Sequence, residues 1–286
     1  MKKTEKIILI PNSEKNIDKK IIDTLVGRLT DKGCTVAVFD DAQLCDSRVR
    51  TVSCAEEVQG YDAALVLGGD GSIIEASHRL MGLDIAVMGI NFGHVGFLTE
   101  LEEEELPLVD KLIEGEYSTE NRMMLDATVT DVAGHVKAEY TVLNDTVITN
   151  GPVARMITFD VYCGGEMLET VRADGVIAAT PTGSTAYSLS AGGPVLDPTL
   201  EGIALTPICP HTLSSRPIIF NGNAEVKIKI KSTNSSSVYI NADGREEYKL
   251  SENDTVRIKR SEIVTRLIHV KNTGFVKTLR HKLSEK

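Results

Sequence analysis

The sequence is most informative at Leu65-Val66-Leu67-Gly68-Gly69-Asp70-Gly71-Ser72, where an apolar run ends in a turn of glycines. The run from Ala63 to Leu67 has the composition of a buried strand, and Ile73 to Leu80 has the pattern of the helix that follows it. Glycines let backbone amides approach phosphate oxygens, and the start of a helix adds partial positive charge. The turn therefore predicts a phosphate site with the carboxylate of Asp70 at its centre.

Strand and helix patterns alternate on both sides of this turn. Ile7 to Ile10 and Thr35 to Phe39 are predicted strands, and an amphipathic helix from about residue 14 to residue 32 separates them. Ile85 to Ile90 is a later strand. Such units imply a parallel sheet with right-handed crossovers, and ligands tend to bind at the carboxyl ends of its strands. We therefore expect residues 1–117 to form an N-terminal Rossmann-like α/β domain.

The pattern changes after about residue 118. Lysines alternate with apolar residues in Val226-Lys227-Ile228-Lys229-Ile230-Lys231, and residues 157–162 alternate in a similar way. Strands with one buried face have this pattern. We expect residues 118–265 to form a β-rich domain that is mostly antiparallel and sandwich-like, and residues 266–286 to pack back on the N-terminal domain.

The composition restricts the classes of partner. The formal net charge of the 286 residues is −10 at pH 7, and an acidic surface repels phosphate backbones, so nucleic acid is not expected to bind. No apolar run approaches the roughly 18 residues that span a bilayer, so we expect no membrane partner. The five cysteines are dispersed and include no Cys-x-x-Cys pair, which is typical of reduced thiols in a cytoplasmic protein.

Two common nucleotide motifs do not fit this chain. The glycine turn is not a Walker A loop, because no Gly-Lys-Ser/Thr follows it, and the first strand-helix turn, Pro11-Asn12-Ser13, lacks Gly-x-Gly-x-x-Gly. Asp70 can instead contact a substrate hydroxyl or a phosphate-bound metal. The structural alternative is a strand-to-helix turn that Asp70 or Ser72 caps. The functional interpretation is a soluble small-molecule kinase.

Three further segments have the composition of ligand-binding loops. Glycines follow a predicted strand in Gly89 to Leu98, where Asn91 is the residue most expected to touch ligand. The dipeptide Asn144-Asp145 can hold the vicinal hydroxyls of a ribose, although a lone dipeptide of this kind also signals a turn. The stretch Thr180 to Pro194 is rich in hydroxyls and glycine. A packed core has little use for such a stretch, whereas a polar ligand does, and Tyr187 is a candidate stacking or phosphate contact.

Together these segments resemble the NAD kinase family. The similarity runs from the Gly-Gly-Asp-Gly turn through Asn91 to Glu100 and Asn144-Asp145, to Asp174 to Pro194 and the loop Pro210 to Pro217. It implies an N-terminal α/β domain, a C-terminal β-rich NAD-binding domain and an active site between them. It also implies transfer of the ATP γ-phosphoryl group to the 2′-hydroxyl of the adenosine ribose of NAD, giving NADP, with a divalent metal such as Mg²⁺ in a homo-oligomer, a dimer or more commonly a tetramer.

The resemblance also implies roles for individual residues. Asp70 is the expected general base or hydroxyl-orienting group, and Gly71 is expected to lie against the dinucleotide. Asn144 and Asp145 are expected to bind ribose. The other positions expected in the NAD and ATP site are Arg155, Arg172, Asp174, Thr182, Thr185, Ala186, Tyr187, Ser188, Leu189, Ser190 and Arg245.

Two positions depart from the family pattern. Many members carry Arg five residues after the catalytic Asp, where this chain has Glu75. His78, about one helical turn further on, is the candidate substitute for holding phosphate. Where the family often has Asp-Gly-Gln near a ligand contact, this chain has Asp243-Gly244-Arg245, so that contact is expected to be ionic.

Two other functions remain open from the residues. A lipid or sugar kinase can share the Gly-Gly-Asp-Gly turn, as diacylglycerol, sphingosine and phosphofructokinase-type kinases do. The Asn144-Asp145 pair and the Thr180 to Pro194 stretch argue against that interpretation. A non-catalytic NADP-binding sensor is the second alternative, and an intact Asp70 argues against it.

Overall fold

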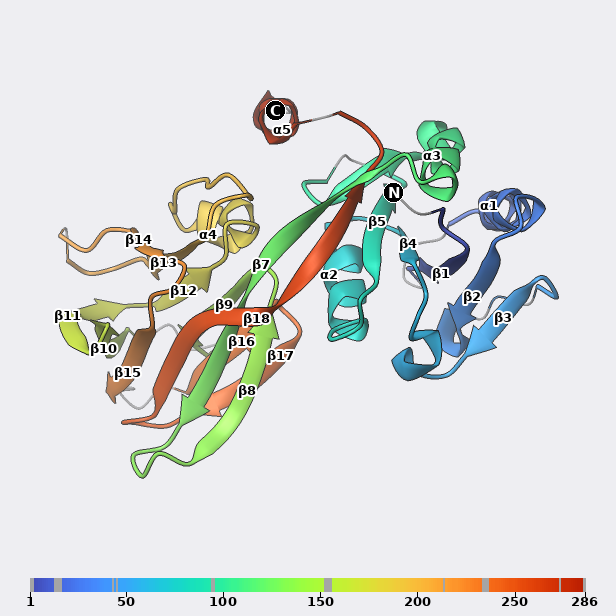
Figure 1. The fold of residues 1–286 in the computed structure, drawn as a ribbon. Helices are drawn as coiled ribbons and strands as arrows, with labels where there is room; N and C mark the ends of the chain where they lie inside the picture. The colour runs from blue at the N-terminus through green and yellow to red at the C-terminus, as the bar shows by residue number, and fades with distance from the viewer. Residues whose placement is uncertain are drawn as a thin grey trace. The chain divides into compact units, whose positions relative to one another are not determined.

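The computed structural model describes residues 3–12, 17–42, 44, 46–93, 96–151, 156–212, 214–232, 237–272 and 274–284. The chain divides into two compact units (Figure 1). The first unit comprises Met1–Asn121 and Thr265–Lys286, and the second comprises Arg122–Val264. Each unit has a hydrophobic core.

The first unit contains a parallel sheet with the strand order β3-β2-β1-β4-β5. Its strands are β1 (Lys6–Pro11), β2 (Thr35–Phe39), β3 (Val49–Val52), β4 (Ala63–Leu67) and β5 (Ala86–Asn91). β6 (Thr99–Glu102) also pairs with β5. The end of β18 (Thr255–His269) also pairs with β5, with Leu267 opposite Val87. The expected parallel α/β sheet is therefore present.

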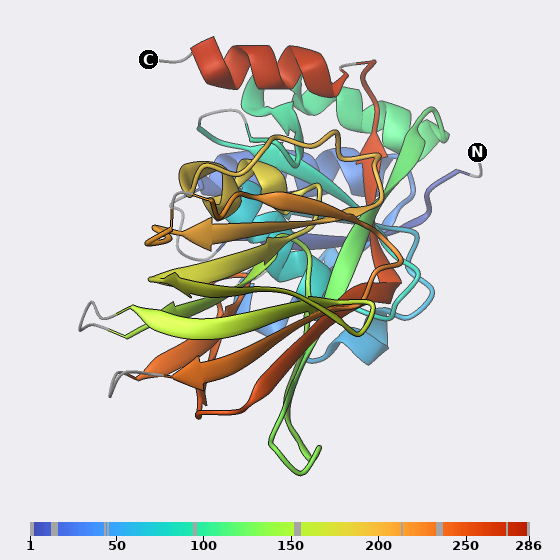
Figure 2. The same ribbon diagram turned by 90° about the vertical axis from the view of Figure 1, so that its left-hand side faces the viewer.

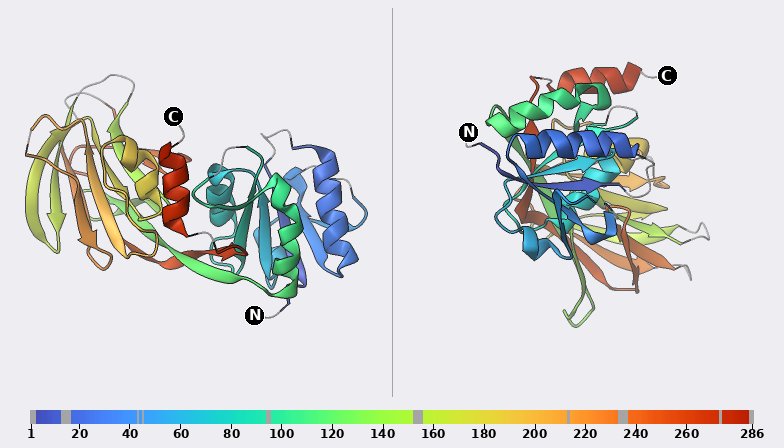
Figure 3. Two further views of the ribbon diagram at one scale, coloured as in Figure 1. Left: turned by 90° about the horizontal axis from the view of Figure 1, so that it is seen from above. Right: turned by 90° about the vertical axis from the view of Figure 1, so that its right-hand side faces the viewer.

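Helices cover the parallel strands (Figure 3). The apolar residues of such helices recur on one face, and this face packs against the sheet. Leu25 and Leu29 of one helix and Leu112 of another share a buried cluster with Leu9 and Leu65 of the strands. The α-helices of this unit are α1 (Lys19–Asp31), α2 (Asp70–Arg79), α3 (Val109–Glu114) and α5 (Phe275–Ser284). Its short 3₁₀ helices are η1 (Asp40–Ala42), η2 (Ala55–Val58) and η3 (Glu103–Leu108).

Helix α1 begins later than the sequence pattern predicts. The pattern predicted a helix from about residue 14, whereas α1 begins at Lys19, and residues 13–16 lie outside the described residues. Asp18 sets this start, because its carboxylate accepts a hydrogen bond from the backbone N–H of Lys20 at 2.9 Å. A side-chain acceptor at this position satisfies a donor that the helix leaves free.

The second unit consists largely of antiparallel strands (Figure 2). Within the described residues, one of its sheets has six strands in the order β14-β13-β12-β9-β16-β17. Those strands are β9 (Asp145–Asn150), β12 (Gly175–Ala179), β13 (Gly202–Ile208), β14 (Ile218–Asn221), β16 (Val238–Ala242) and β17 (Glu246–Leu250). The remaining strands are β7 (Ser118–Thr130), β8 (Val136–Val142), β10 (Ile157–Cys163), β11 (Glu166–Ala173) and β15 (Val226–Ser232).

The core of the second unit joins its two sets of strands. Phe159 of β10 and Ile228 of β15 belong to the same buried cluster as Ile148 of β9 and Ile240 of β16. Two layers that share one core are the arrangement of a β-sandwich. The expected fold class, parallel α/β followed by mostly antiparallel β, is confirmed.

Two expectations from composition concern the described part of the chain. No helix there combines the length and the apolar character needed to cross a bilayer. The cysteines described are all free, namely Cys34, Cys54, Cys163 and Cys209. Cys45 lies outside the described residues.

Candidate functional site

The glycine turn after β4 is shaped by close contacts. A Cβ atom at Gly68 would collide with the side chain of Ser72, so a residue larger than glycine forces the turn to move. Ser72 is buried, and its Oγ accepts a hydrogen bond of 2.7 Å from Nδ2 of Asn12, at the end of β1. Gly69 precedes α2 and no side chain caps the helix there. The turn connects a strand to a helix, as the structural alternative also has it, but the N-cap position is Gly69 rather than Asp70 or Ser72.

The carboxylate of Asp70 is held by the loop that follows β5. Oδ2 accepts a hydrogen bond from the backbone N–H of Phe97 at 2.8 Å, and Oδ1 accepts one from Leu98 at 2.9 Å. A Cβ at Gly96 would collide with this carboxylate. Carboxylate oxygens have about four acceptor positions in all, so Asp70 can still accept a hydrogen bond from a substrate hydroxyl. Gly71 beside it is exposed, with open space where a Cβ would point.

A second feature of the first unit is a small pocket of about 40 Å³ beside the glycine turn. Glu75 lines it, and so does Arg79. Nη1 of Arg79 lies 2.7 Å from Oδ2 of Asp41, and its guanidinium carbon lies 3.3 Å from the ring centroid of Phe39. Arg79 is thus the cation that lines this pocket together with Glu75, and His78 does not line it.

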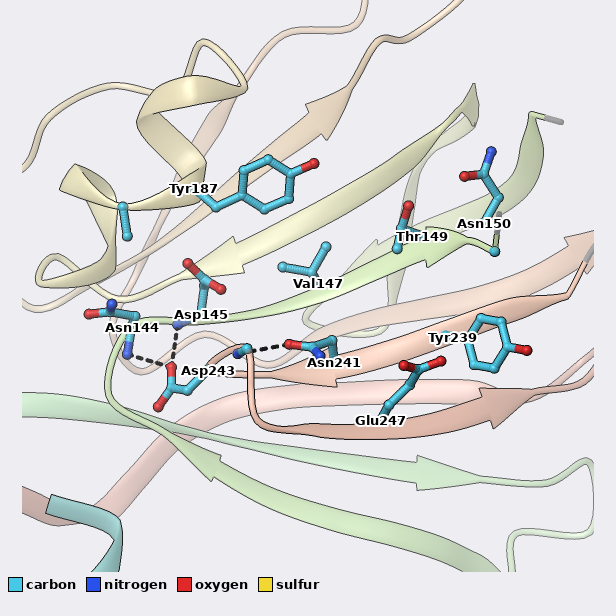
Figure 4. Close-up of a pocket in the computed structure, with 13 residues that line it drawn as sticks. Asn144, Asp145, Val147, Thr149, Asn150, Tyr187, Tyr239, Asn241, Asp243 and Glu247 are labelled. Atoms are coloured by element: carbon cyan, nitrogen blue, oxygen red, sulfur yellow. Dashed lines mark hydrogen bonds between the residues drawn. The ribbon is translucent and has the colours of Figure 1, made fainter. Parts of the chain in front are cut away.

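The larger candidate site is a pocket of about 670 Å³ in the second unit. Its volume is within the roughly 300–1,000 Å³ that is usual for small-molecule sites. Side chains from β9, β16, β17 and α4 (Tyr187–Ser190) surround it (Figure 4). We call it the nucleoside pocket, because the resemblance predicts that its residues Asn144 and Asp145 bind ribose. It is lined by Asn144, Asp145, Val147, Thr149, Asn150, Gly151, Ala186, Tyr187, Tyr239, Asn241, Asp243, Gly244 and Glu247.

The dipeptide Asn144-Asp145 is fixed from two directions. The backbone N–H groups of Asn144 and Asp145 donate to Oδ1 of Asp243 at 2.9 and 3.0 Å. On the other side, the N–H of Thr180 donates to the carbonyl of Asn144 at 2.8 Å. Gly183 packs so closely that a Cβ there would collide with the same carbonyl. The backbone of the dipeptide is therefore rigidly placed at the pocket.

The side chain of Asn144 carries an unsatisfied acceptor. Its Oδ1 is buried and has no hydrogen-bond partner among the described residues. A buried polar atom without a partner costs about 1–3 kcal/mol, and such atoms are rare in native proteins. A ligand hydroxyl or amine that donates to Oδ1 removes this cost, so the acceptor points to a ligand.

Electrostatics make the nucleoside pocket unsuitable for a phosphate. Burial, and then the charge of Asp243, raise the pKa of Asp145 to about 7. Glu247 adds a further carboxylate, and no described Lys or Arg lines the pocket. The aromatic rings of Tyr187 and Tyr239 border the same space (Figure 4). A neutral or cationic ring system with hydroxyl groups fits this lining better than an anion does.

The structure brings together four of the residues expected from the sequence: Asn144, Asp145, Ala186 and Tyr187 all line the nucleoside pocket. Asp70 and Gly71 belong to the first unit. Arg155 lies outside the described residues. The described residues of the second unit that were expected in the site but do not line this pocket are Arg172, Asp174, Thr182, Thr185, Ser188, Leu189, Ser190 and Arg245.

The hydroxyl-rich stretch differs from expectation. Its Thr180, Ser184 and Ser188 are all completely buried, so part of this stretch belongs to the core, while Ala186 and Tyr187 line the pocket. The reason is local hydrogen bonding. Thr180 donates to the carbonyl of Leu143 at 2.6 Å, and the Ser188 hydroxyl lies 3.0 Å from that of Thr206. Short polar side chains that are satisfied in this way are tolerated in a core.

Several pocket residues were missed in the sequence, although the signal was present. Side chains alternate across a strand, so the placement of Asp145 on the pocket face also implies Val147 and Thr149. The same period of two relates Tyr239 to Asn241 on β16. Asn91, in contrast, is only 2% exposed at the end of β5.

Comparisons with known proteins agree with this architecture. The family model described as the ATP-NAD kinase N-terminal domain matches residues 7–117, and the ATP-NAD kinase C-terminal domain matches residues 143–270. The chain is 39% identical over 284 residues to an NAD kinase of Caldanaerobacter subterraneus, covering 99% of this chain and 100% of that one. It is 40% identical over 270 residues to an NAD kinase of Citrifermentans bemidjiense, covering 92% of each.

Solved structures share the fold. Yeast NADH kinase complexed with NADH matches with a TM-score of 0.89 at 24% identity, covering 100% of this chain and 89% of that one. An Archaeoglobus fulgidus NAD kinase in complex with ATP matches with a TM-score of 0.73 at 24% identity, covering 97% and 98%. At this level of identity the likeness concerns the fold alone.

Proposed function

The chain belongs to the NAD kinase family, and on this premise we propose that it transfers the γ-phosphoryl group of ATP to the 2′-hydroxyl of the adenosine ribose of NAD, giving NADP. The observation that carries the proposal is the anchoring of Asp70 by the N–H groups of Phe97 and Leu98. A carboxylate held in this way, in a turn of glycines, is prepared to orient a hydroxyl.

Asp70 has a modest chemical task in this reaction. Phosphoryl transfer depends on alignment and charge stabilisation more than on a strong base. A ribose hydroxyl is a weak acid, so a carboxylate within hydrogen-bond reach can orient it and accept its proton late in the reaction. Gly69 and the start of α2 provide backbone N–H groups and a favourable dipole for phosphate oxygens, whereas the N–H of Gly68 donates to the carbonyl of Ile90 at 2.9 Å.

A magnesium ion would complete the charge stabilisation. The described residues contain no group of three or more His, Cys, Asp or Glu that could hold a metal on their own. Mg²⁺ commonly binds through one or two carboxylates together with substrate phosphates, and Asp70 in the glycine turn fits that mode. When bound, the metal would neutralise the triphosphate.

We assign the nucleoside pocket to a nucleoside part of the dinucleotide and not to its pyrophosphate. Asn144 and Asp145 line this pocket, which supports a role for them in binding ribose hydroxyls. The buried Oδ1 of Asn144 has no hydrogen-bond donor among the described residues, and a ribose hydroxyl can supply one. Tyr187 and Tyr239 offer ring faces to a planar group. The carboxylates that line the pocket disfavour phosphate.

The proposal extends to the protein's assembly and location. We infer a homo-oligomer, a dimer or tetramer, in the cytoplasm. The free thiols in the described part of the chain support a reducing compartment. Neither nucleic acid nor a membrane is proposed as a partner.

The experiment that tests the function is an incubation with NAD, ATP and Mg²⁺, with NADP read by an NADP-specific dehydrogenase. The proposal predicts NADP formation that requires all three. If the protein binds NADP in a thermal-shift assay but forms none, the sensor alternative is correct. If labelled ATP phosphorylates a lipid or sugar and not NAD, the protein is a kinase of another class.

A further inference from the structure

We propose that Asp243 is a positioning residue of the nucleoside pocket, because its carboxylate fixes the backbone of residues 143–145 and thereby sets where Asn144 and Asp145 meet the substrate. The inference rests on the proposed function and adds to it. It gives a role to a residue about 100 positions away in the chain, in the turn between β16 and β17.

The geometry consists of bonds that converge on one carboxylate. Oδ2 of Asp243 accepts from the N–H of Leu143 at 2.7 Å. Its Oδ1 accepts from the N–H groups of Asn144 at 2.9 Å and Asp145 at 3.0 Å (Figure 4). In return, the N–H of Asp243 donates to the carbonyl of Asp145 at 3.0 Å. Hydrogen bonds to a charged acceptor are roughly twice as strong as neutral ones, so the contact is unusually rigid.

Asp243 is the first central residue of the tight turn between β16 and β17, where the N–H of Arg245 donates to the carbonyl of Ala242 at 3.0 Å. Its φ is +50°, and that of Gly244 is +69°. A positive φ at both central residues is typical of tight hairpin turns, and Asp-Gly is a preferred pair at these positions. The side chain of Asn241 supports the turn, because its Oδ1 accepts a hydrogen bond of 2.8 Å from the N–H of Gly244. The turn therefore holds Asp243 at the place from which its carboxylate reaches the backbone of residues 143–145.

The choice of a carboxylate has a second consequence. The charge of Asp243 adds to burial in raising the pKa of Asp145, and an uncharged acceptor at this place would not. The other titratable groups that line the pocket are Glu247, Tyr187 and Tyr239. Asp243 therefore influences both the position and the protonation of a residue that we expect to hold ribose.

This assignment changes the interpretation of Asp243-Gly244-Arg245. The sequence suggested that Arg245 makes the ligand contact. In the structure Arg245 is exposed and does not line the nucleoside pocket, and its backbone N–H donates to the carbonyl of Ala242 at 3.0 Å. The residues of this turn that face the pocket are Asp243 and Gly244.

The test compares two substitutions of Asp243 in the NADP-forming assay. Asp243→Asn removes the charge and one acceptor. We expect it to raise the KM for NAD at least tenfold, to leave the KM for ATP within twofold, and to move the pH dependence of kcat/KM for NAD to lower pH. Asp243→Glu keeps the charge but displaces the carboxylate by one methylene. We expect the same rise in KM with no shift of the pH profile.

Asp131→Asn is the matched control. The Asp131 carboxylate also accepts backbone hydrogen bonds, from Ala133 and His135 at 2.9 Å each, in the turn between β7 and β8, and it does not line the nucleoside pocket. We expect its KM for NAD to equal that of the wild type. A rise in the KM for NAD that occurs in Asp243→Asn but not in Asp131→Asn is therefore specific to Asp243. It is not a general result of removing a carboxylate that accepts backbone hydrogen bonds in a turn.

The outcomes separate this inference from the proposed function. A wild-type protein that forms no NADP contradicts the proposed function itself. A wild-type protein that forms NADP, with a folded Asp243→Asn variant whose KM for NAD is unchanged, contradicts only the positioning role. If circular dichroism shows that Asp243→Asn does not fold, Asp243→Glu decides, and an unchanged KM there overturns the inference.

Discussion

The glycine turn of the first unit and the nucleoside pocket of the second treat their carboxylates in opposite ways. Asp70 receives two backbone N–H groups, so its oxygens are held and neutralised in part by the protein. Asp145 is only 6% exposed and lies near a second carboxylate, Asp243, which together raise its pKa to about 7. The difference suggests a division of labour in which the turn performs the chemistry and the pocket provides binding.

The largest expected effect is at the turn. Asp70→Asn should lower kcat by about 10³-fold, within the usual range for losing a group that assists proton transfer, while thermal shift still reports NAD binding. Asp62→Asn is the matched control in the same unit, because Asp62 also accepts two backbone N–H bonds, at 2.9 and 2.8 Å, from Glu5 and Lys6. An equal fall in kcat in both variants would contradict a specific role of Asp70 in the reaction.

The next effect concerns the unsatisfied acceptor of the pocket. Asn144→Ala should raise the KM for NAD by about 100-fold, which corresponds to a lost hydrogen bond to a buried group. The free energy of unfolding should not fall, because Oδ1 has no partner in the described structure. Chemical denaturation measures this directly. A clear loss of stability in the absence of ligand would mean that Oδ1 is satisfied in the free protein.

A smaller effect follows from the raised pKa of Asp145. Its pKa is higher in the folded state than in the unfolded chain, so the folded state binds more protons and stability falls as pH rises from about 4 to about 7. Asp145→Asn should therefore be more stable than the wild type by about 2 kcal/mol above pH 7. The gain should vanish below about pH 4. Melting curves of both proteins across this range test it, and a gain at all pH values would contradict it.

The smallest effect concerns carboxylates of the first unit that pair with a histidine, whereas Asp145 of the second unit lies near another carboxylate. His269 lies 2.8 Å from Glu100 and 3.0 Å from Glu120, and these partners raise its pKa to about 9. Its contribution to stability is full below the unfolded pKa of about 6.5 and is lost as pH rises through about 9. His269→Gln should lower the free energy of unfolding by about 1 kcal/mol at pH 6 and by less at pH 10. A loss independent of pH would assign His269 to packing alone.

Much of the fold was predictable because local patterns determine it. The alternation of Val226 to Lys231 and the apolar run before Gly68 each indicate one secondary structure, and the structure has both strands. The start of α1 was not predicted, because a single capping side chain, Asp18, overrides the apolar periodicity. Local propensity and tertiary or capping contacts compete at such boundaries.

The site was predictable in part. Asp70 and the Asn144-Asp145 pair have distinctive composition, whereas Asp243 acts through bonds that span about 100 residues of sequence. No local pattern records a contact of that range. In the Thr180 to Pro194 stretch, the composition predicted ligand contacts for hydroxyls that are buried and hydrogen-bonded in the core. Composition alone does not distinguish such a hydroxyl from one that faces a ligand.

The most direct test of the division of labour is a single-turnover measurement of NADP formation with NAD and ATP both saturating. Under these conditions binding is complete, so the rate reports the chemical step. Wild type and Asn144→Ala are predicted to react at the same rate, and Asp70→Asn about 10³-fold more slowly. A rate for Asp70→Asn close to that of the wild type would contradict the assignment of the chemistry to the glycine turn.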